Sequence, residues 1–139
     1  MKIFLDANVL VSVLNKEYPL FTYSSRVLSL ADDSAYKVYT SPLCLAIAFY
    51  FAEKKHGTAH ARTKIKFLIE KLDFTTISHK NVFEVEKNKK IHDMEDGLQY
   101  YSAVDSGCKC IVTEDQDDFY FSEIEVLNSR DFMEKYVFR

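Results

Sequence analysis

The sequence of 139 residues is poor in glycine and proline, with three Gly and two Pro. Both residue types interrupt helices and strands, so their scarcity excludes long irregular regions. Long apolar runs are missing too, and none approaches the ~18–20 residues that span a bilayer. Near the N-terminus, Asp6 and Asn8 break the apolar stretch and no small-residue cleavage site follows, so no signal peptide is expected.

Cysteine is scarce as well. Cys44, Cys108 and Cys110 are an odd number, which suits a reducing cytosol better than a disulfide framework. Cys108 and Cys110 have no second cysteine pair and no histidine near them, so a zinc site is not expected. The sequence therefore predicts a cytoplasmic protein that does not enter a membrane.

The residues that are present are those of a folded globular protein. Hydrophobic residues make up 47% of the chain and charged residues 28%. The length suits one domain that is large enough to bury a core, and we expect residues 1–139 to form it.

Charge is unevenly distributed along the chain. The formal net charge is −3, yet residues 54–90 hold ten Lys or Arg against four Asp or Glu. A basic segment of this kind suits a phosphate backbone, and it equally suits a solvated helical face. The candidates for RNA contact in this segment are Lys54, Lys55, Arg62, Lys64, Lys87, Lys89 and Lys90.

Predicted strands and helices alternate along the chain. The strands are expected at residues 2–6, 37–41, 74–78, 110–113 and 125–128. The helices are expected at residues 8–14, 20–32, 42–56, 61–72, 81–90, 93–107 and 129–138. Asn8 and Ser129 are expected to cap two of these helices. The alternation predicts the α/β class, as a three-layer α/β/α sandwich with a central, mostly parallel sheet.

Carboxylates gather where the predicted strands end. Asp6 closes the first strand, Asp93 and Asp96 open a later helix, and residues 114–118 contain four acids. Ligands of parallel sheets bind outside the carboxyl ends of the strands. Anions held together raise one another's pKa, and an oxygen-bound cation such as Mg²⁺ or Mn²⁺ resolves the conflict. Structural explanations remain open, since Asp93 suits a helix cap and residues 114–118 suit an acidic turn.

Three stretches carry a resemblance to a known family. They read FLDANVLVSVL at residues 4–14, DMEDGLQYYSAVDSGCKCIVTEDQDDF at residues 93–119 and VLNSRDFMEKY at residues 126–136. In order and spacing the chain resembles a PIN domain, and within that group the small prokaryotic proteins related to VapC-type toxins. The resemblance implies the α/β/α fold, Mg²⁺- or Mn²⁺-dependent endoribonuclease activity and a small antitoxin partner.

The resemblance also implies roles for individual residues. Acids of the motifs would be catalytic, and these are Asp6, Asp96, Asp115 and Asp118. The first three would hold the metal, and the supporting residues would be Asn8, Asp93 and Thr113. One departure is visible, because many PIN nucleases carry an acid early in the helix after the second strand. Here that helix has no acid until Glu53, which weakens the expected metal site.

Together these observations predict an endoribonuclease that hydrolyses RNA phosphodiester bonds, as the toxin of a toxin–antitoxin pair. Its expected partners are RNA and a cognate antitoxin, and a homodimer stays open. The alternative is a PIN-fold module with weakened catalysis that binds RNA or protein. A flavodoxin-like or response-regulator-like domain shares the layer pattern, but the sequence offers no phosphoacceptor Asp after a middle strand.

Overall fold

The computed structural model describes residues 1–138, which build one five-stranded sheet. The strand order is β3-β2-β1-β4-β5, and all four neighbouring pairs are parallel. The strands are β1 (Lys2–Leu5), β2 (Lys37–Thr40), β3 (Asp73–Phe74), β4 (Cys110–Val112) and β5 (Glu125–Leu127).

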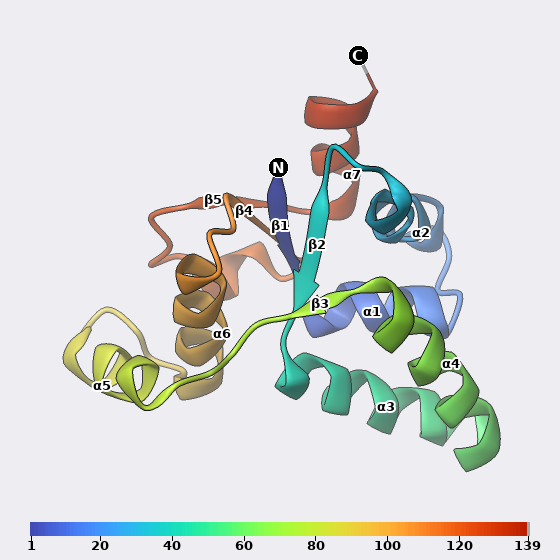
Figure 1. Cartoon of the computed structure of the whole chain (residues 1–139), viewed down its shortest axis with the longest axis horizontal. Helices are drawn as coiled ribbons and strands as arrows, with labels where there is room; N and C mark the ends of the chain where they lie inside the picture. The colour runs from blue at the N-terminus through green and yellow to red at the C-terminus, as the bar shows by residue number, and fades with distance from the viewer. Residues whose placement is uncertain (139) are drawn as a thin grey trace.

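Helices cover both faces of this sheet. The α-helices are α1 (Ala7–Leu14), α2 (Phe21–Ser29), α3 (Pro42–His56), α4 (Thr58–Lys71), α5 (His79–Lys87), α6 (Met94–Asp105) and α7 (Ser129–Phe132). Shorter turns are η1 (Leu30–Asp32), η2 (Gln116–Phe119) and η3 (Met133–Val137). Figure 1 shows α5 and α6 on one side of the sheet and α1 to α4 with α7 on the other. The predicted three-layer α/β/α sandwich is confirmed.

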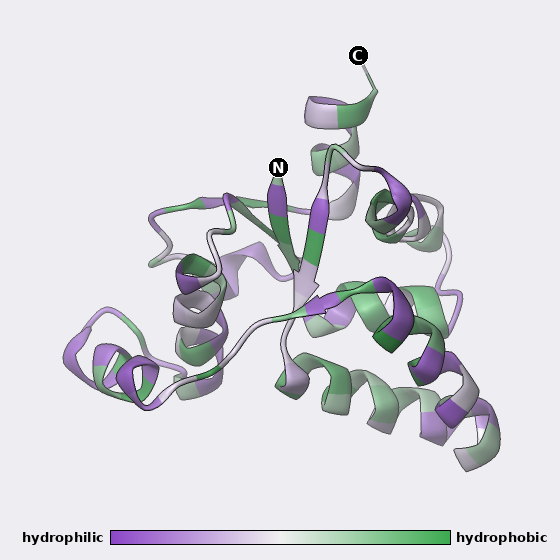
Figure 2. Cartoon of the chain, in the orientation of Figure 1, coloured by the Kyte–Doolittle hydropathy of each residue, from purple (hydrophilic) through white to green (hydrophobic). Residues whose placement is uncertain are grey.

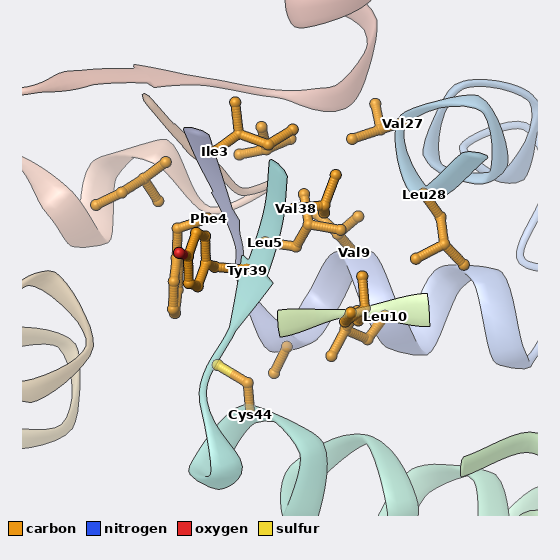
Figure 3. Close-up of a cluster of buried hydrophobic side chains, with 14 of the residues drawn as sticks. Ile3, Phe4, Leu5, Val9, Leu10, Val27, Leu28, Val38, Tyr39 and Cys44 are labelled. Carbon is orange, nitrogen blue, oxygen red and sulfur yellow. The ribbon is translucent and has the colours of Figure 1, made fainter. Parts of the chain in front are cut away.

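The core lies on both faces of the central strand. Phe4 and Tyr39 project side by side to one face, whereas Leu5 and Val38 project to the other face, toward Leu28 of α2 (Figure 3). Ile3, Phe4 and Leu5 have no solvent exposure, as expected for a parallel strand covered on both sides. Hydrophilic residues are concentrated on the outer turns and in the segment between α5 and α6 (Figure 2).

Several predicted boundaries differ from those of the structure. Helix α1 is capped by Asp6, whose side chain accepts from the Ala7 N–H, and the predicted cap Asn8 lies inside the helix. Both residue types cap helices well, so composition alone could not choose between them. In the same way α7 is capped by Asn128, one residue before the predicted cap Ser129.

The third strand is shorter and earlier than predicted. Strand β3 has two residues, and the Thr75 N–H continues the pairing by donating to the Thr40 carbonyl at 2.8 Å. The chain then leaves the sheet because Ser78 caps α5 in a capping box with Asn81. The segment at residues 74–78 predicted a longer strand because it is rich in residues that favour strands, but its last residue, Ser78, belongs to the cap of α5.

A glycine lets α6 approach α5 closely. A Cβ at Gly97 would lie 2.8 Å from Val85 Cγ1 and 2.9 Å from Ile91 Cγ2, which is closer than side-chain carbons pack. Gly97 follows Asp96 directly, so this contact fixes the first turn of α6 against α5.

The three cysteines are buried and form no disulfide. Burial raises the pKa of Cys44, Cys108 and Cys110 to about 12, so these thiols are not reactive. None of the helices within residues 1–138 combines the length and the apolar character needed to cross a membrane.

Candidate active site

The candidate site lies where the strand order reverses, between β1 and β4. From β1 the chain runs outward through β2 to β3, and it then returns to β4 on the other side of β1. Asp6 follows β1 and Thr113 follows β4, and the Asp6 N–H donates to the Val112 carbonyl at 3.0 Å. Such switch points are where open α/β sheets bind ligands.

Asp6 is held by donors from four residues. Its Oδ1 accepts from the Ala7 N–H at 2.8 Å and lies 3.8 Å from Cys44 Sγ. Its Oδ2 accepts from Thr113 Oγ1 at 2.8 Å and lies 3.4 Å from Asn8 Nδ2. Burial raises the pKa of Asp6, and the bonds from Thr113 and Ala7 oppose that rise.

Asn8 joins α1 to the loop that follows β4. Its Nδ2 lies 3.1 Å from both Thr113 Oγ1 and Asp115 Oδ2, and its Oδ1 accepts from the Glu114 N–H at 3.1 Å. Thr113 Oγ1 also accepts from the Asp115 N–H at 3.1 Å. These bonds fix the positions of Asp6 and Asp115 relative to each other.

The first turn of α6 supplies further acids. Asp93 caps the helix, accepting from the Asp96 N–H at 3.0 Å, so the structural explanation for Asp93 is confirmed. Asp96 has no donor to its carboxylate among residues 1–138. Burial, followed by the charges of Asp93, Asp118 and Asp6, raises the pKa of Asp96 to about 7. Burial and Asp93 also raise the pKa of Glu95.

The turn η2 carries the remaining predicted acid. The Asp118 N–H donates to the Asp115 carbonyl at 3.0 Å, which closes the turn after β4. Burial and the neighbouring charges of Asp115 and Asp93 raise the pKa of Asp118. Acids from β1, α6 and the β4–η2 loop therefore act on one another electrostatically.

These side chains line one cleft of about 340 Å³. Of the predicted site residues it includes Asp6, Asn8, Asp96, Asp115 and Asp118. The predicted supporting residues Asp93 and Thr113 act from behind the cleft, through the hydrogen bonds described above. The structure thus brings all four predicted acids to one place.

Two further acids at the cleft have no predicted role. Glu95 lies beside Asp96 in the acidic stretch, so its neighbours in the sequence could have identified it. Glu17 reaches the cleft from the segment after α1, where the Glu17 N–H donates to the Ser12 carbonyl at 3.0 Å. No sequence signal marks Glu17, because its position depends on how that segment folds back.

One wall of the cleft is apolar. Ile47 and Phe51, one turn apart on α3, line it. Glu53 points elsewhere, since its Oε2 accepts from Thr58 Oγ1 at 2.9 Å. Helix α3 therefore contributes no carboxylate to the cleft, as the sequence predicted.

The basic residues predicted to hold RNA are divided between the two sides of the sheet. One group lies on α3 and α4, and comprises Lys54, Lys55, Arg62 and Lys64. The other lies at the end of α5 and before α6, and comprises Lys87, Lys89 and Lys90. In the first group, Lys55 Nζ donates to the Asn15 carbonyl at 2.6 Å, so this lysine is already engaged. The second group borders the acidic entrance of α6.

The donors of the cleft suit a hard divalent cation. Its polar groups are carboxylate and amide oxygens, and the pKa values of Asp6 and Asp96 are raised by burial and by the charges of neighbouring acids. Within residues 1–138, as they stand, no three His, Cys, Asp or Glu side chains are close enough to hold one ion together. Mg²⁺ keeps several of its waters when it binds to proteins, so carboxylates at this spacing can share one ion through those waters.

The chain matches known proteins over most of its length. A family model described as PIN domain matches residues 2–117, so the chain belongs to the PIN domain family. It is similar to Ribonuclease VapC1 of Aquifex aeolicus (strain VF5), with 28% identity over 139 residues. That alignment covers 97% of this chain and 95% of the relative. The predicted resemblance to PIN domains and VapC-type proteins is confirmed.

Solved structures share the fold. The crystal structure of VapBC2 from Rickettsia felis, bound to a DNA fragment from their promoter, matches with a TM-score of 0.70 and 20% identity. That match covers 92% of this chain and 98% of the other. VapC20 of Mycobacterium tuberculosis, a sarcin–ricin loop cleaving toxin, matches with a TM-score of 0.68 and 13% identity, over 89% of this chain and 98% of the other.

Proposed function

We propose that this protein is an endoribonuclease that hydrolyses RNA phosphodiester bonds, and that it is the toxin of a toxin–antitoxin pair. The observation that carries the proposal is the convergence of Asp6, Asp96, Asp115 and Asp118 on one cleft at the switch point of the sheet. Family membership and the similarity to a ribonuclease support the reaction class.

Mg²⁺ or Mn²⁺ is the proposed cofactor, held by Asp6, Asp96 and Asp115. When bound, such an ion would activate water and stabilise the negative charge that develops on the phosphate. Asp118, at the edge of the same cleft, would orient water or substrate by accepting hydrogen bonds.

The remaining residues of the site position these acids. Thr113 and Asn8 hold Asp6 and Asp115 in a fixed relation through hydrogen bonds of 2.8 to 3.1 Å. Asp93 fixes the first turn of α6 and so the place of Asp96. Groups that are positioned before substrate arrives lose little free energy to reorganisation during the reaction.

The same comparisons support the proposed partners. RNA is the substrate, and a small cognate antitoxin protein is the partner, as in the VapBC2 assembly of Rickettsia felis. The proposed location is the cytoplasm, where the three free thiols would stay reduced. Residues 1–139 are proposed as a single domain, and a homodimer is compatible with the proposal.

The second candidate is a PIN-fold module that binds RNA or protein with weakened catalysis. The apolar wall of Ile47 and Phe51 favours it, because an acid that PIN nucleases often carry on this helix is missing. The two candidates differ in whether bound RNA is cut.

Incubation of the protein with a mixed RNA pool, with Mn²⁺ or with EDTA, separates them. The nuclease cleaves with Mn²⁺ only, and Asp6→Asn abolishes cleavage while the protein still folds. Glu53→Gln is the matched control, because this acid lies on α3 outside the cleft. Intact RNA under both conditions, together with measurable RNA binding, would establish the second candidate instead.

A further inference from the structure

A second groove lies beside the acidic cleft. It has a volume of about 660 Å³ and lies between the segment after α5 and the turn after η2. Asn88, Lys90 and His92 line it on one side, and Tyr120 and Glu123 on the other. The catalytic roles proposed above use none of these side chains.

Tyr120 presents a fixed aromatic surface in this groove. Its residue is 56% exposed, although its ring contacts Phe121 edge-on with centroids 5.3 Å apart. Its hydroxyl donates to the Lys90 carbonyl and accepts from the His92 N–H at 3.2 Å. A large exposed aromatic that is held at both ends loses little freedom when a flat ligand stacks on it.

His92 extends the same surface. The centroids of the His92 and Tyr120 rings are 5.5 Å apart, at an interplanar angle of 49°. His92 directly precedes Asp93, the cap of α6, and Tyr120 lies two residues after Asp118. The ring pair therefore connects the two acidic segments that face each other across the cleft.

The charges around the groove favour one orientation of a nucleotide. The exposed Lys90 on one side suits a phosphate, and the carboxylate of Glu123 on the other repels one. Glu123 suits the N–H groups on the edge of a base. Aromatic rings that stack bases beside a basic segment are how many proteins hold single-stranded RNA.

We propose that this groove binds the base of an RNA nucleotide next to the cleaved phosphodiester, stacked on Tyr120 and His92, with its phosphate toward Lys90. The proposal rests on the proposed function, which makes RNA the substrate. The groove would place the strand so that the neighbouring phosphodiester enters the acidic cleft, and it would favour unpaired over base-paired RNA.

Binding of a short single-stranded RNA, measured by fluorescence anisotropy in EDTA, tests the groove without cleavage. Tyr120→Ala is expected to weaken binding by about 5- to 150-fold, the range that loss of one stacked base gives. Tyr120→Phe keeps the ring and should retain most of the affinity. If Tyr120→Phe binds as weakly as Tyr120→Ala, the hydroxyl contact alone matters and the stacking proposal is wrong.

A matched control comes from a similar ring pair elsewhere. His79 and Phe83 on α5 have centroids 4.9 Å apart, and Phe83 is 53% exposed. Their position is distant from the cleft, because the start of α5 lies beside the end of α6, where Asn81 Nδ2 donates to Asp105 Oδ2. Phe83→Ala should leave RNA affinity unchanged. An equal loss in both alanine variants would overturn the proposal.

An abasic series of the same RNA identifies the stacked nucleotide. One abasic position should weaken binding to the wild type and have no further effect on Tyr120→Ala. If Mn²⁺-dependent cleavage occurs but no abasic position distinguishes the two proteins, the groove fails and the nuclease stands. If one abasic position weakens binding to the wild type only, but the wild type does not cleave RNA, the groove proposal is supported and the nuclease proposal is wrong.

Discussion

The two sides of the cleft hold their carboxylates differently. On the strand side, the Asp6 carboxylate accepts hydrogen bonds from Thr113 Oγ1 and from the Ala7 N–H, both at 2.8 Å. Asn8 lies between Asp6 and Asp115. On the helix side, Asp96 is placed by the backbone of α6, and in the described chain no donor reaches its carboxylate. The carboxylate of Asp6 is therefore fixed by hydrogen bonds before any ligand binds. The carboxylate of Asp96 has no such bonds in the described chain, and its negative charge is not neutralised.

The two sides therefore have opposite effects on folding stability. The hydrogen bonds of the strand side stabilise the fold while they position Asp6. The helix side lowers stability, because the carboxylate of Asp96 is partly buried and lies close to the charges of Asp93, Asp118 and Asp6. A cation that lies between the two sides would remove that repulsion, so metal binding and folding are expected to be linked.

The largest effects are expected when the carboxylates of Asp6 and Asp96 are replaced one at a time. Both variants should lose activity, but their stabilities should differ. Asp6→Asn and Asp96→Asn should each lower Mn²⁺-dependent RNA cleavage by orders of magnitude. Without metal, Asp96→Asn should melt at a higher temperature than the wild type because it removes a repelled charge, whereas Asp6→Asn should not, because it disturbs several hydrogen bonds. Wild-type cleavage by Asp96→Asn would mean that the α6 entrance serves only as a cap.

Loss of one hydroxyl on the strand side should cost stability. Thr113→Val keeps the shape of the side chain but leaves the Asp115 N–H and the Asn8 amide without their shared acceptor. We expect the free energy of unfolding to fall by about 1–3 kcal/mol, measured by denaturant titration, together with slower cleavage. Thr75→Val, another buried hydroxyl, should lose stability but keep cleavage. Normal cleavage by Thr113→Val would show that the strand side needs no such fixing.

The cap of α6 should contribute stability through hydrogen bonding rather than through charge. Asp93→Ala removes the acceptor of the Asp96 N–H and should cost about 0.5–2 kcal/mol of unfolding free energy. Asp93→Ser should keep most of that stability, because serine is also a good cap. Equal losses in the two variants would argue that the charge of Asp93, not its hydrogen bond, holds this helix.

The helix side should also make stability depend on pH. The pKa of Asp96 is raised to about 7, above the ~3.9 of an unfolded chain, so the folded state binds the proton more tightly. In EDTA, the melting temperature should therefore fall as the pH rises from about 4 through about 7. Asp96→Asn should flatten that fall, and saturating Mn²⁺ should raise the wild-type curve most at the higher pH. Parallel curves for the variant and the wild type would place the pH dependence elsewhere.

The smallest effect on stability is expected for the basic segment beside α6. Replacing Lys87, Lys89 and Lys90 by Gln should leave the melting temperature nearly unchanged, because exposed charges contribute little. The salt dependence of RNA binding should become less steep, by about 0.7 in logarithmic slope for each lost phosphate contact. An unchanged slope would make these lysines part of a solvated surface only.

The sequence predicted the layers of this fold because apolar segments of strand and helix length alternate clearly. The sequence predicted the first and last residues of those elements less well. Strand β3 ends early because Ser78 caps α5, and α1 begins at Asp6 because that side chain reaches the Ala7 N–H. Such competition between neighbouring polar residues depends on tertiary positions that local composition does not contain.

A gathering of acids at this edge was predictable because parallel strands deliver their carboxyl ends to it, but the choice of Asp6, Asp96, Asp115 and Asp118 among those acids rested on the resemblance to PIN domains. For α3, the sequence indicated only that an acid expected at the cleft is missing. That Ile47 and Phe51 form a wall there, and that Glu17 reaches the same cleft, depends on how the segment after α1 returns to α3. The groove at Tyr120 was equally hidden, since its two sides come from segments about thirty residues apart.

The close approach at Gly97 restricts how this family of sequences can diverge. Any side chain at this position would collide with Val85 and Ile91, and an added methyl group in a filled core costs about 1–3 kcal/mol. Relatives with alanine at this position should therefore carry a smaller residue in place of Val85 or Ile91. The acid beside the glycine is then inherited together with two apolar residues that pack against the first turn of α6.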